Sequence, residues 1–106
     1  MNTISPTMAS CIEKCLSCYT ICLRAPVDTS EITFDKAHLT LMLTCAEMCR
    51  TCAHFMILGT VHHKHTCREC AEICAECALV FEGMNGMQAC VDACRECAQE
   101  CAMMAA

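Results

Sequence analysis

Cysteine thiols recur along this chain at intervals of three and four residues. The clearest stretch is CRECAEICAEC, which carries Cys67, Cys70, Cys74 and Cys77. Side chains at these intervals lie about 5–6 Å apart on one face of an α-helix. Two such sulfurs can converge on one soft metal ion, whose bonds to sulfur are about 2.3 Å long. The chemistry that this spacing predicts is metal binding.

Three other segments carry the same spacing: CIEKCLSCYTIC, CAEMCRTC and CVDACRECAQEC. Together the four segments contain every cysteine of the chain, fifteen in 106 residues. All fifteen are therefore predicted metal ligands: Cys11, Cys15, Cys18, Cys22, Cys45, Cys49, Cys52, Cys67, Cys70, Cys74, Cys77, Cys90, Cys94, Cys97 and Cys101.

Four helices are needed to carry these segments. Helix starts favour Ser, Thr or Asp as N-cap and Pro in the first turn, whereas Gly and Pro are typical of helix ends. The predicted helices run from Pro6, after Ser5 as N-cap, to Pro26; from Thr33, with Asp35 close behind, to Gly59; from about Val61 to Glu82; and from the Asn85-Gly86 turn to the C-terminus.

Short connections between four helices favour an all-α fold, an antiparallel up-down-up-down four-helix bundle. The length of 106 residues indicates one domain, spanning residues 1–106. No segment alternates apolar and polar residues as a strand would. Because a three-four repeat is the pattern of a helix face that packs inward, we expect a core lined with cysteine.

Two structural roles compete with metal binding. A free cysteine is a small hydrophobe and is often buried, but thiols fill a core less well than leucine, and fifteen are too many for packing alone. Disulfides between neighbouring cysteines of one helix would be strained, and an odd number of cysteines cannot pair completely within the chain. Metal binding is therefore the preferred interpretation.

Composition restricts compartment and partners. The N-terminal MNTISPTMAS has no export signal, and apolar runs such as Phe55 to Leu58 are too short to span a membrane. We therefore expect a cytoplasmic protein with no membrane partner. The net charge is −5 and no basic patch is longer than HHKH, so nucleic-acid binding is not expected. No nucleophile–base pattern or phosphate loop predicts an enzyme.

The type of metal follows from the number and position of the thiols. Fifteen thiols would complete at most three four-sulfur zinc sites. Iron–sulfur clusters usually take cysteines from loops, whereas these lie along helices. Cu(I) is soft and binds thiolate and thioether at low coordination number, so Cu(I) is the predicted ion. A zinc or other soft-metal buffer, or a thiol redox buffer, remains the alternative.

The segments CAEMCRTCA and CRECAEICAECA resemble those of the bacterial four-helix-bundle copper storage proteins, in particular the cytosolic type. The similarity extends from about Met8 to Ala105. This resemblance implies that many Cu(I) ions are stored inside each bundle. It also implies a homo-oligomer, often a tetramer. A copper chaperone or efflux system is a further expected partner.

The resemblance further implies that copper enters through one open end of the bundle that carries His and Met residues. The matching residues are His38, Met42, Met84 and Met87, whereas Ile21 and Leu23 of the first helix offer no donor. The opposite end, which carries Met56 and His63, is the second candidate.

Overall fold

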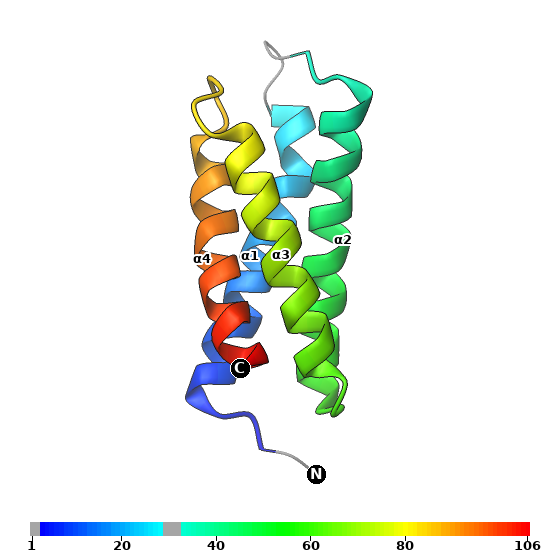
Figure 1. Cartoon of the computed structure of the whole chain (residues 1–106), viewed down its shortest axis with the longest axis vertical. Helices are drawn as coiled ribbons and strands as arrows, with labels where there is room; N and C mark the ends of the chain where they lie inside the picture. Colours follow the sequence, from blue (N-terminus) through cyan, green and yellow to red (C-terminus); the bar gives the residue numbers. More distant parts are fainter. Residues whose placement is uncertain (1–2, 29–32) are drawn as a thin grey trace.

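Four α-helices make up the regular structure of the chain. The computed structural model describes residues 3–28 and 33–106, and contains α1 (Pro6–Asp28), α2 (Lys36–Leu58), α3 (His63–Phe81) and α4 (Gln88–Ala105). The helices lie side by side along the long axis of a molecule that measures 47 × 21 × 20 Å (Figure 1). No strand occurs within the described ranges, which confirms the all-α prediction.

Each helix packs against the next one along the chain, and α4 returns to pack against α1. Successive helices run in opposite directions, so the predicted up-down-up-down bundle is confirmed (Figure 1). We call the end that holds the starts of α2 and α4 the Phe81 end, at the top of Figure 1. The opposite end, where α2 finishes and α3 begins, is the His63 end.

Side-chain caps define the starts of α1 and α2. The Oγ atom of Ser5 accepts a hydrogen bond from the Met8 backbone N–H at 3.1 Å, which confirms Ser5 as the cap of α1. Asp35 caps α2, since its Oδ1 accepts from the His38 N–H at 2.7 Å. The prediction that Thr33 starts this helix was wrong. The carboxylate of Asp35, two residues later, accepts the hydrogen bond from an N–H of the first turn and so caps the helix.

The prediction that Pro26 ends the first helix was also wrong, because α1 continues to Asp28. Proline removes a single N–H donor, and in the last turn of a helix that loss affects only one hydrogen bond. An ion pair of 2.6 Å between Arg24 and Asp28 also spans the proline. Gly59 ends α2 as predicted, with a left-handed φ of 72°.

The third helix is slightly shorter than predicted. It begins at His63 rather than Val61, because residues 61 and 62 form a turn, and it ends at Phe81 rather than Glu82. The fourth helix starts after the Asn85-Gly86 turn and continues to Ala105, close to the predicted C-terminal limit.

The core consists mainly of sulfur. All fifteen cysteines are buried, together with Met42, Met56, Phe81, Met87 and Val91 as the larger apolar side chains. No polar or charged residue is buried in the described part of the chain. Because neutral thiols are tolerated as small apolar groups, this interior can form a core without metal.

Helix α2 is long and apolar enough, by length and composition alone, to cross a membrane. Its most apolar window has a mean hydropathy of 1.3, and 39% of that window is buried within the bundle. Uninterrupted apolar runs such as Phe55 to Leu58, on which the prediction rested, are too short to reveal this property. A core helix of a bundle passes the same test, since its inward face must be apolar.

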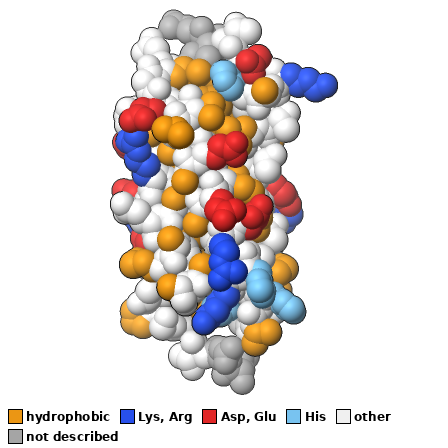
Figure 2. Space-filling view, viewed as in Figure 1, with side chains coloured by type: hydrophobic (Ala, Val, Ile, Leu, Met, Phe, Trp, Pro, Cys, Tyr) orange, Lys and Arg blue, Asp and Glu red, His pale blue; other side chains and the backbone are white. Residues whose placement is uncertain are grey.

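The surface carries charged side chains with apolar ones between them (Figure 2). Lys14 of α1 forms an ion pair of 3.3 Å with Glu96 of α4, and Arg95 of α4 forms one of 2.7 Å with Glu82 at the end of α3. Exposed ion pairs contribute little to stability. The bundle is therefore held together chiefly by its sulfur-rich interior.

Candidate metal centre

The thiols form a continuous column along the axis of the bundle. Each of the four helices contributes its cysteines to the interior, because each presents one three-four stripe inward. Fourteen of the fifteen cysteines have an exposed fraction of 0%, and Cys90 has 2%. All fifteen are free thiols.

Neighbouring sulfurs in the column lie 3.4–4.0 Å apart. Within one helix, the Sγ atoms of residues four apart approach to 3.8 Å for Cys18 and Cys22, and to 3.9 Å for Cys70 and Cys74. The closest contacts are between helices. They are 3.4 Å for Cys22–Cys90 and 3.5 Å for Cys49–Cys74, Cys52–Cys67 and Cys15–Cys101.

These separations suit ligands of one ion. Bonds of about 2.3 Å place two sulfurs about 3.8 Å apart in a tetrahedral site and about 4.0 Å apart in a trigonal site. A disulfide would require about 2.05 Å. The thiols are thus already spaced for a metal ion before any ion is bound.

Five groups of thiols have sulfur atoms that all lie within 4.8 Å of one another. They include every cysteine, and Cys18, Cys22, Cys94 and Cys101 each belong to two groups. The groups are Cys11, Cys67 and Cys101; Cys15, Cys52, Cys70 and Cys101; Cys18, Cys49, Cys74 and Cys97; Cys18, Cys22, Cys45 and Cys94; and Cys22, Cys77, Cys90 and Cys94.

Shared sulfurs connect these groups into one network. Sulfur-to-sulfur contacts of 3.7 Å from Cys97 to Cys15 and 3.8 Å from Cys97 to Cys101 join the groups that have no member in common. A thiolate can bridge two soft metal ions, so the arrangement can hold clusters rather than isolated ions. It also offers a continuous path for an ion to move by exchange of one sulfur for the next.

Hydrogen bonds between thiols divide their pKa values into two sets. The pKa of Cys74 is raised because its hydrogen bonds to Cys18 and Cys45 favour the protonated form. The pKa of Cys45 is lowered because it accepts hydrogen bonds from Cys18 and Cys22. The pKa of Cys18 is lowered to about 7 by its hydrogen bond with Cys22.

The pKa is raised for eight thiols, namely Cys15, Cys22, Cys49, Cys67, Cys74, Cys77, Cys94 and Cys101. It is lowered for the other seven, namely Cys11, Cys18, Cys45, Cys52, Cys70, Cys90 and Cys97. The eight thiols with a raised pKa therefore keep their protons at neutral pH. A metal ion that binds there must displace them.

The residues proposed for the open end all lie at the Phe81 end. Met42 and Met87 are buried in the core, and Met84 is half-buried against it. The side chain of His38 is 32% exposed, and its Nδ1 lies 3.5 Å from Oδ1 of Asp35. The thioethers thus lie next to the thiol column and the imidazole lies nearer to solvent.

Phe81 is the residue of this end whose importance the sequence analysis did not recognise. It is fully buried, and its ring centroid lies 5.4 Å from that of His38 and 6.1 Å from that of Phe34. Its position four residues after Cys77 was the available signal, because that spacing continues the inward stripe. The three rings cover this end of the column.

The His63 end has a different composition. Met56 is fully buried, whereas Met8 and Met104 are half-buried against the core. The Nδ1 atom of His63 lies 2.9 Å from the backbone oxygen of Thr60, so the ring is held by the turn between α2 and α3. Among the other imidazoles, His54, His62 and His65 are exposed.

Comparison with protein families identifies one match. The model of the copper storage protein family matches residues 1–106 of this chain. A search of curated protein sequences found no match.

Three solved structures are similar over almost the whole chain. The Nmul_A1745 protein from Nitrosospira multiformis is 40% identical, with a TM-score of 0.88, over 93% of this chain and 94% of that one. The copper-free copper storage protein 3 from Bacillus subtilis is 31% identical, with a TM-score of 0.79, over 92% and 98%. The Cu(I)-bound copper storage protein BsCsp3 is 28% identical, with a TM-score of 0.83, over 94% and 99%.

Proposed function

This chain belongs to the copper storage protein family, and from that premise we propose that its core thiols are the ligands of many stored Cu(I) ions. The observation that supports this assignment is the spacing of the sulfurs, which lie 3.4–4.0 Å from their neighbours along the full length of the bundle. Every cysteine belongs to at least one group that could hold an ion. The stored ions are cargo, and the chain has no catalytic role in this proposal.

The alternatives make different demands on the thiols. A redox buffer needs thiols that solvent can reach, whereas fourteen of these have an exposed fraction of 0%. A zinc buffer needs separate tetrahedral sites, whereas four cysteines here are shared between two groups each. Shared sulfurs instead favour Cu(I), which forms clusters with bridging thiolates.

Titration of the fully reduced protein with Cu(I), against a coloured competing chelator, tests this function. We expect the chain to bind well over about three Cu(I) ions, the limit for closed four-sulfur zinc sites. The five thiol groups are the physical reason, because shared sulfurs let the groups fill together.

The matched experiment uses Zn(II) in competition with Cu(I). We expect Cu(I) to displace Zn(II), because thiolates bind the softer ion more tightly. Saturation at three or fewer Cu(I) ions per chain, or a preference for Zn(II), would contradict the storage function.

We further propose that copper enters and leaves through the Phe81 end, by way of His38, Met42, Met84 and Met87. Thioethers bind Cu(I) without losing a proton, whereas each thiol must release one. Ligands of this kind can therefore exchange copper with a donor and pass it to the nearest thiols. Buried Met42 and Met87 support this role, since they adjoin the sulfur column.

Replacing Met42, Met84 and Met87 together with Leu tests the route. The change keeps the apolar volume nearly constant, so the fold and the total copper capacity should change little. We expect slower uptake and slower release, measured by following transfer to and from a coloured chelator. Unchanged transfer rates would show that copper enters elsewhere, and the same substitution of Met56 at the His63 end would then be the next test.

The remaining aspects of the proposal concern assembly and location. Exposed leucines on two adjacent helices, at 37% for Leu16 and 45% for Leu23 of α1 and 42% for Leu43 of α2, support a homo-oligomer such as a tetramer. We propose a cytoplasmic location, where thiols stay reduced, and a copper chaperone or efflux system as the exchange partner.

A further inference from the structure

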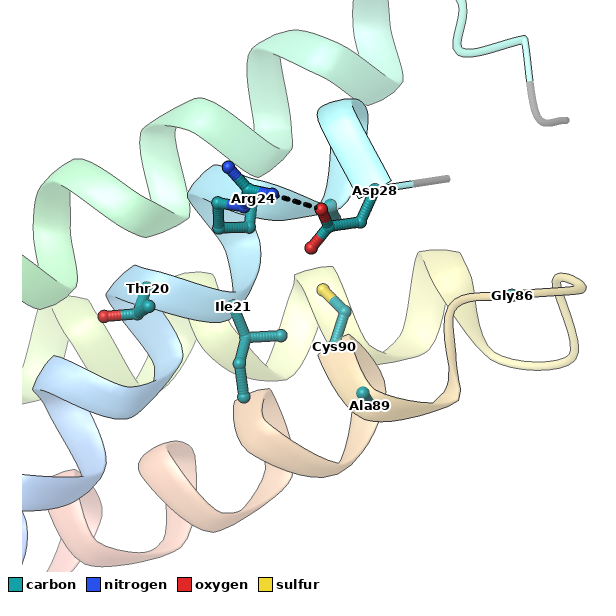
Figure 3. A pocket seen from close by; sticks show the side chains of 8 residues that line it. Thr20, Ile21, Arg24, Asp28, Gly86, Ala89 and Cys90 are labelled. Carbon is teal, nitrogen blue, oxygen red and sulfur yellow. Dashed lines mark hydrogen bonds and ion pairs between the residues drawn. The ribbon is translucent and has the colours of Figure 1, made fainter. Parts of the chain in front are cut away.

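A pocket with a volume of about 300 Å³ opens on the side of the bundle between α1 and the start of α4. Figure 3 shows it from close by, with the sulfur of Cys90 pointing from α4 toward α1. Its walls include Ile21, Arg24, Asp28, Gly86, Ala89 and Cys90. The pocket thus connects solvent with one member of the thiol column.

Cys90 differs from the other cysteines in its access to solvent. Its exposed fraction is 2%, whereas that of the other fourteen is 0%. Its Sγ lies 3.4 Å from that of Cys22, which in turn lies 3.6 Å from that of Cys94. These three thiols and Cys77 form one of the five groups. An ion that reaches Cys90 from the pocket would immediately meet further sulfur ligands.

The axial route at the same end is more obstructed. Phe81 is fully buried and contacts both Phe34 and His38, so three rings cover the column there. The side pocket reaches Cys90 without passing these rings, because it is lined by residues of α1, of α4 and of the turn before α4. Copper bound to a small thiolate would therefore encounter less obstruction at the side, and the methionines at the axial end remain the proposed route for copper from a protein donor.

We propose that this pocket receives a small anionic Cu(I)–thiolate complex and transfers its copper to Cys90. The inference rests on the proposed storage function and names the chemical class of the copper donor. In the transfer, a bond forms between Cu(I) and Sγ of Cys90, and one bond between Cu(I) and the donor thiolate breaks. The departing thiolate takes up one proton, either that of the Cys90 thiol or one from solvent, and copper remains Cu(I).

The size of the pocket favours such a donor, and its charge does not oppose one. A volume of about 300 Å³ is at the lower limit of small-molecule pockets, so it can admit a small thiol but not a folded protein. Cu(I) with two thiolates carries one negative charge, and the guanidinium of Arg24 lies at the pocket, where it forms an ion pair of 2.6 Å with Asp28 of the same wall. This pair neutralises the carboxylate of Asp28, so the pocket presents no net negative charge to an anion although the chain as a whole carries −5.

The test blocks the pocket without removing a copper ligand. In the Ala89→Phe variant, a bulky side chain would occupy the pocket wall beside Cys90. The matched control is Ala75→Phe, which fills a pocket of similar volume, about 290 Å³, between α3 and α4 with no cysteine in its walls. Both alanines are exposed, so both variants should fold, as far-UV circular dichroism would verify.

Uptake is measured by mixing each reduced protein with Cu(I) held by excess N-acetylcysteine. We expect Ala89→Phe to take up copper at least about fivefold more slowly, Ala75→Phe to stay within about twofold of the parent, and all three to reach the same capacity. Equal uptake rates for both variants, at full capacity, would contradict copper entry through the side pocket but not the storage function. A capacity of three ions or fewer in the parent would overturn both.

A second measurement tests directly whether a reagent in solvent can reach the thiol of Cys90. Brief treatment of the copper-free protein with iodoacetamide, followed by mass spectrometry of peptides, should show Cys90 modified before any other cysteine. The Ala89→Phe variant should lose this preference. First modification of Cys11 or Cys101, at the opposite end of the column, would overturn the proposal.

Discussion

Loading the reduced protein with Cu(I) is expected to raise its midpoint of thermal unfolding by at least about 20 °C. Each kcal/mol added to the free energy of unfolding shifts the midpoint of a domain of this size by about 4–8 °C. A ligand that binds only the native state stabilises it by about 4 kcal/mol per site when its free concentration is 1,000 times Kd. Five thiol groups can bind ions, and the unfolded chain does not hold the sulfurs in this arrangement.

Thermal melts followed by far-UV circular dichroism, with and without Cu(I) under anaerobic conditions, measure this effect. The copper-free protein should already be helical, because its core contains no buried polar side chain in the described part of the chain. Removing copper with a strong chelator should restore the original midpoint. A copper-free protein without helical signal would instead indicate a chain that folds around its metal.

Alkaline unfolding of the copper-free protein is the second large expected effect. Eight thiols have a raised pKa in the folded state, whereas an unfolded thiol titrates near its model value of 9.0. Below that pH their contribution to stability is fully present. Above it, the unfolded chain loses protons that the folded core keeps, so the free energy of unfolding falls as pH rises.

The free energy of unfolding should fall steeply as pH rises. Each such thiol lowers the free energy of unfolding by about 1.4 kcal/mol per pH unit, and eight together by on the order of 10 kcal/mol, similar to the whole stability of a domain. The seven thiols with a lowered pKa add nothing to this slope above pH of about 9, because a group whose folded pKa lies below its unfolded value affects the pH dependence only below that unfolded value. We therefore expect the bundle to unfold within about one to two pH units above this value.

Urea unfolding between pH of about 7 and 11, under anaerobic conditions, measures the slope. The copper-loaded protein is the control, since its thiols have no protons left to lose. It should remain folded where the copper-free protein does not. A copper-free bundle whose stability is unchanged up to pH of about 11 would contradict the role of the raised pKa values.

The periodicity of the cysteines was enough to predict much of the fold. Stripes at three-four spacing specify which face of each helix is buried, and short connections between helices leave few topologies. That is why the bundle and the inward position of all fifteen thiols were predicted correctly. Helix limits were less accurate, since they depend on single interactions such as the Asp35 cap and the Arg24–Asp28 ion pair.

Contacts between helices could not be derived from spacing. The closest sulfurs, those of Cys22 and Cys90, are 68 positions apart in the sequence, and their meeting depends on the relative shift of α1 and α4 along the axis. The three rings at the Phe81 end and the pocket at Cys90 depend on the same packing. A sequence pattern predicts the face of a helix on which a side chain lies, but not which residue of another helix it contacts.

X-ray diffraction at the copper absorption edge, from crystals of the Cu(I)-loaded protein, tests the assignment of the thiols most directly. We predict anomalous peaks along the bundle axis, from the group of Cys22, Cys77 and Cys90 to that of Cys11, Cys67 and Cys101. Each peak should lie about 2.3 Å from at least two sulfurs. Peaks confined to exposed histidines such as His62 and His65, with none in the core, would contradict storage on the core thiols.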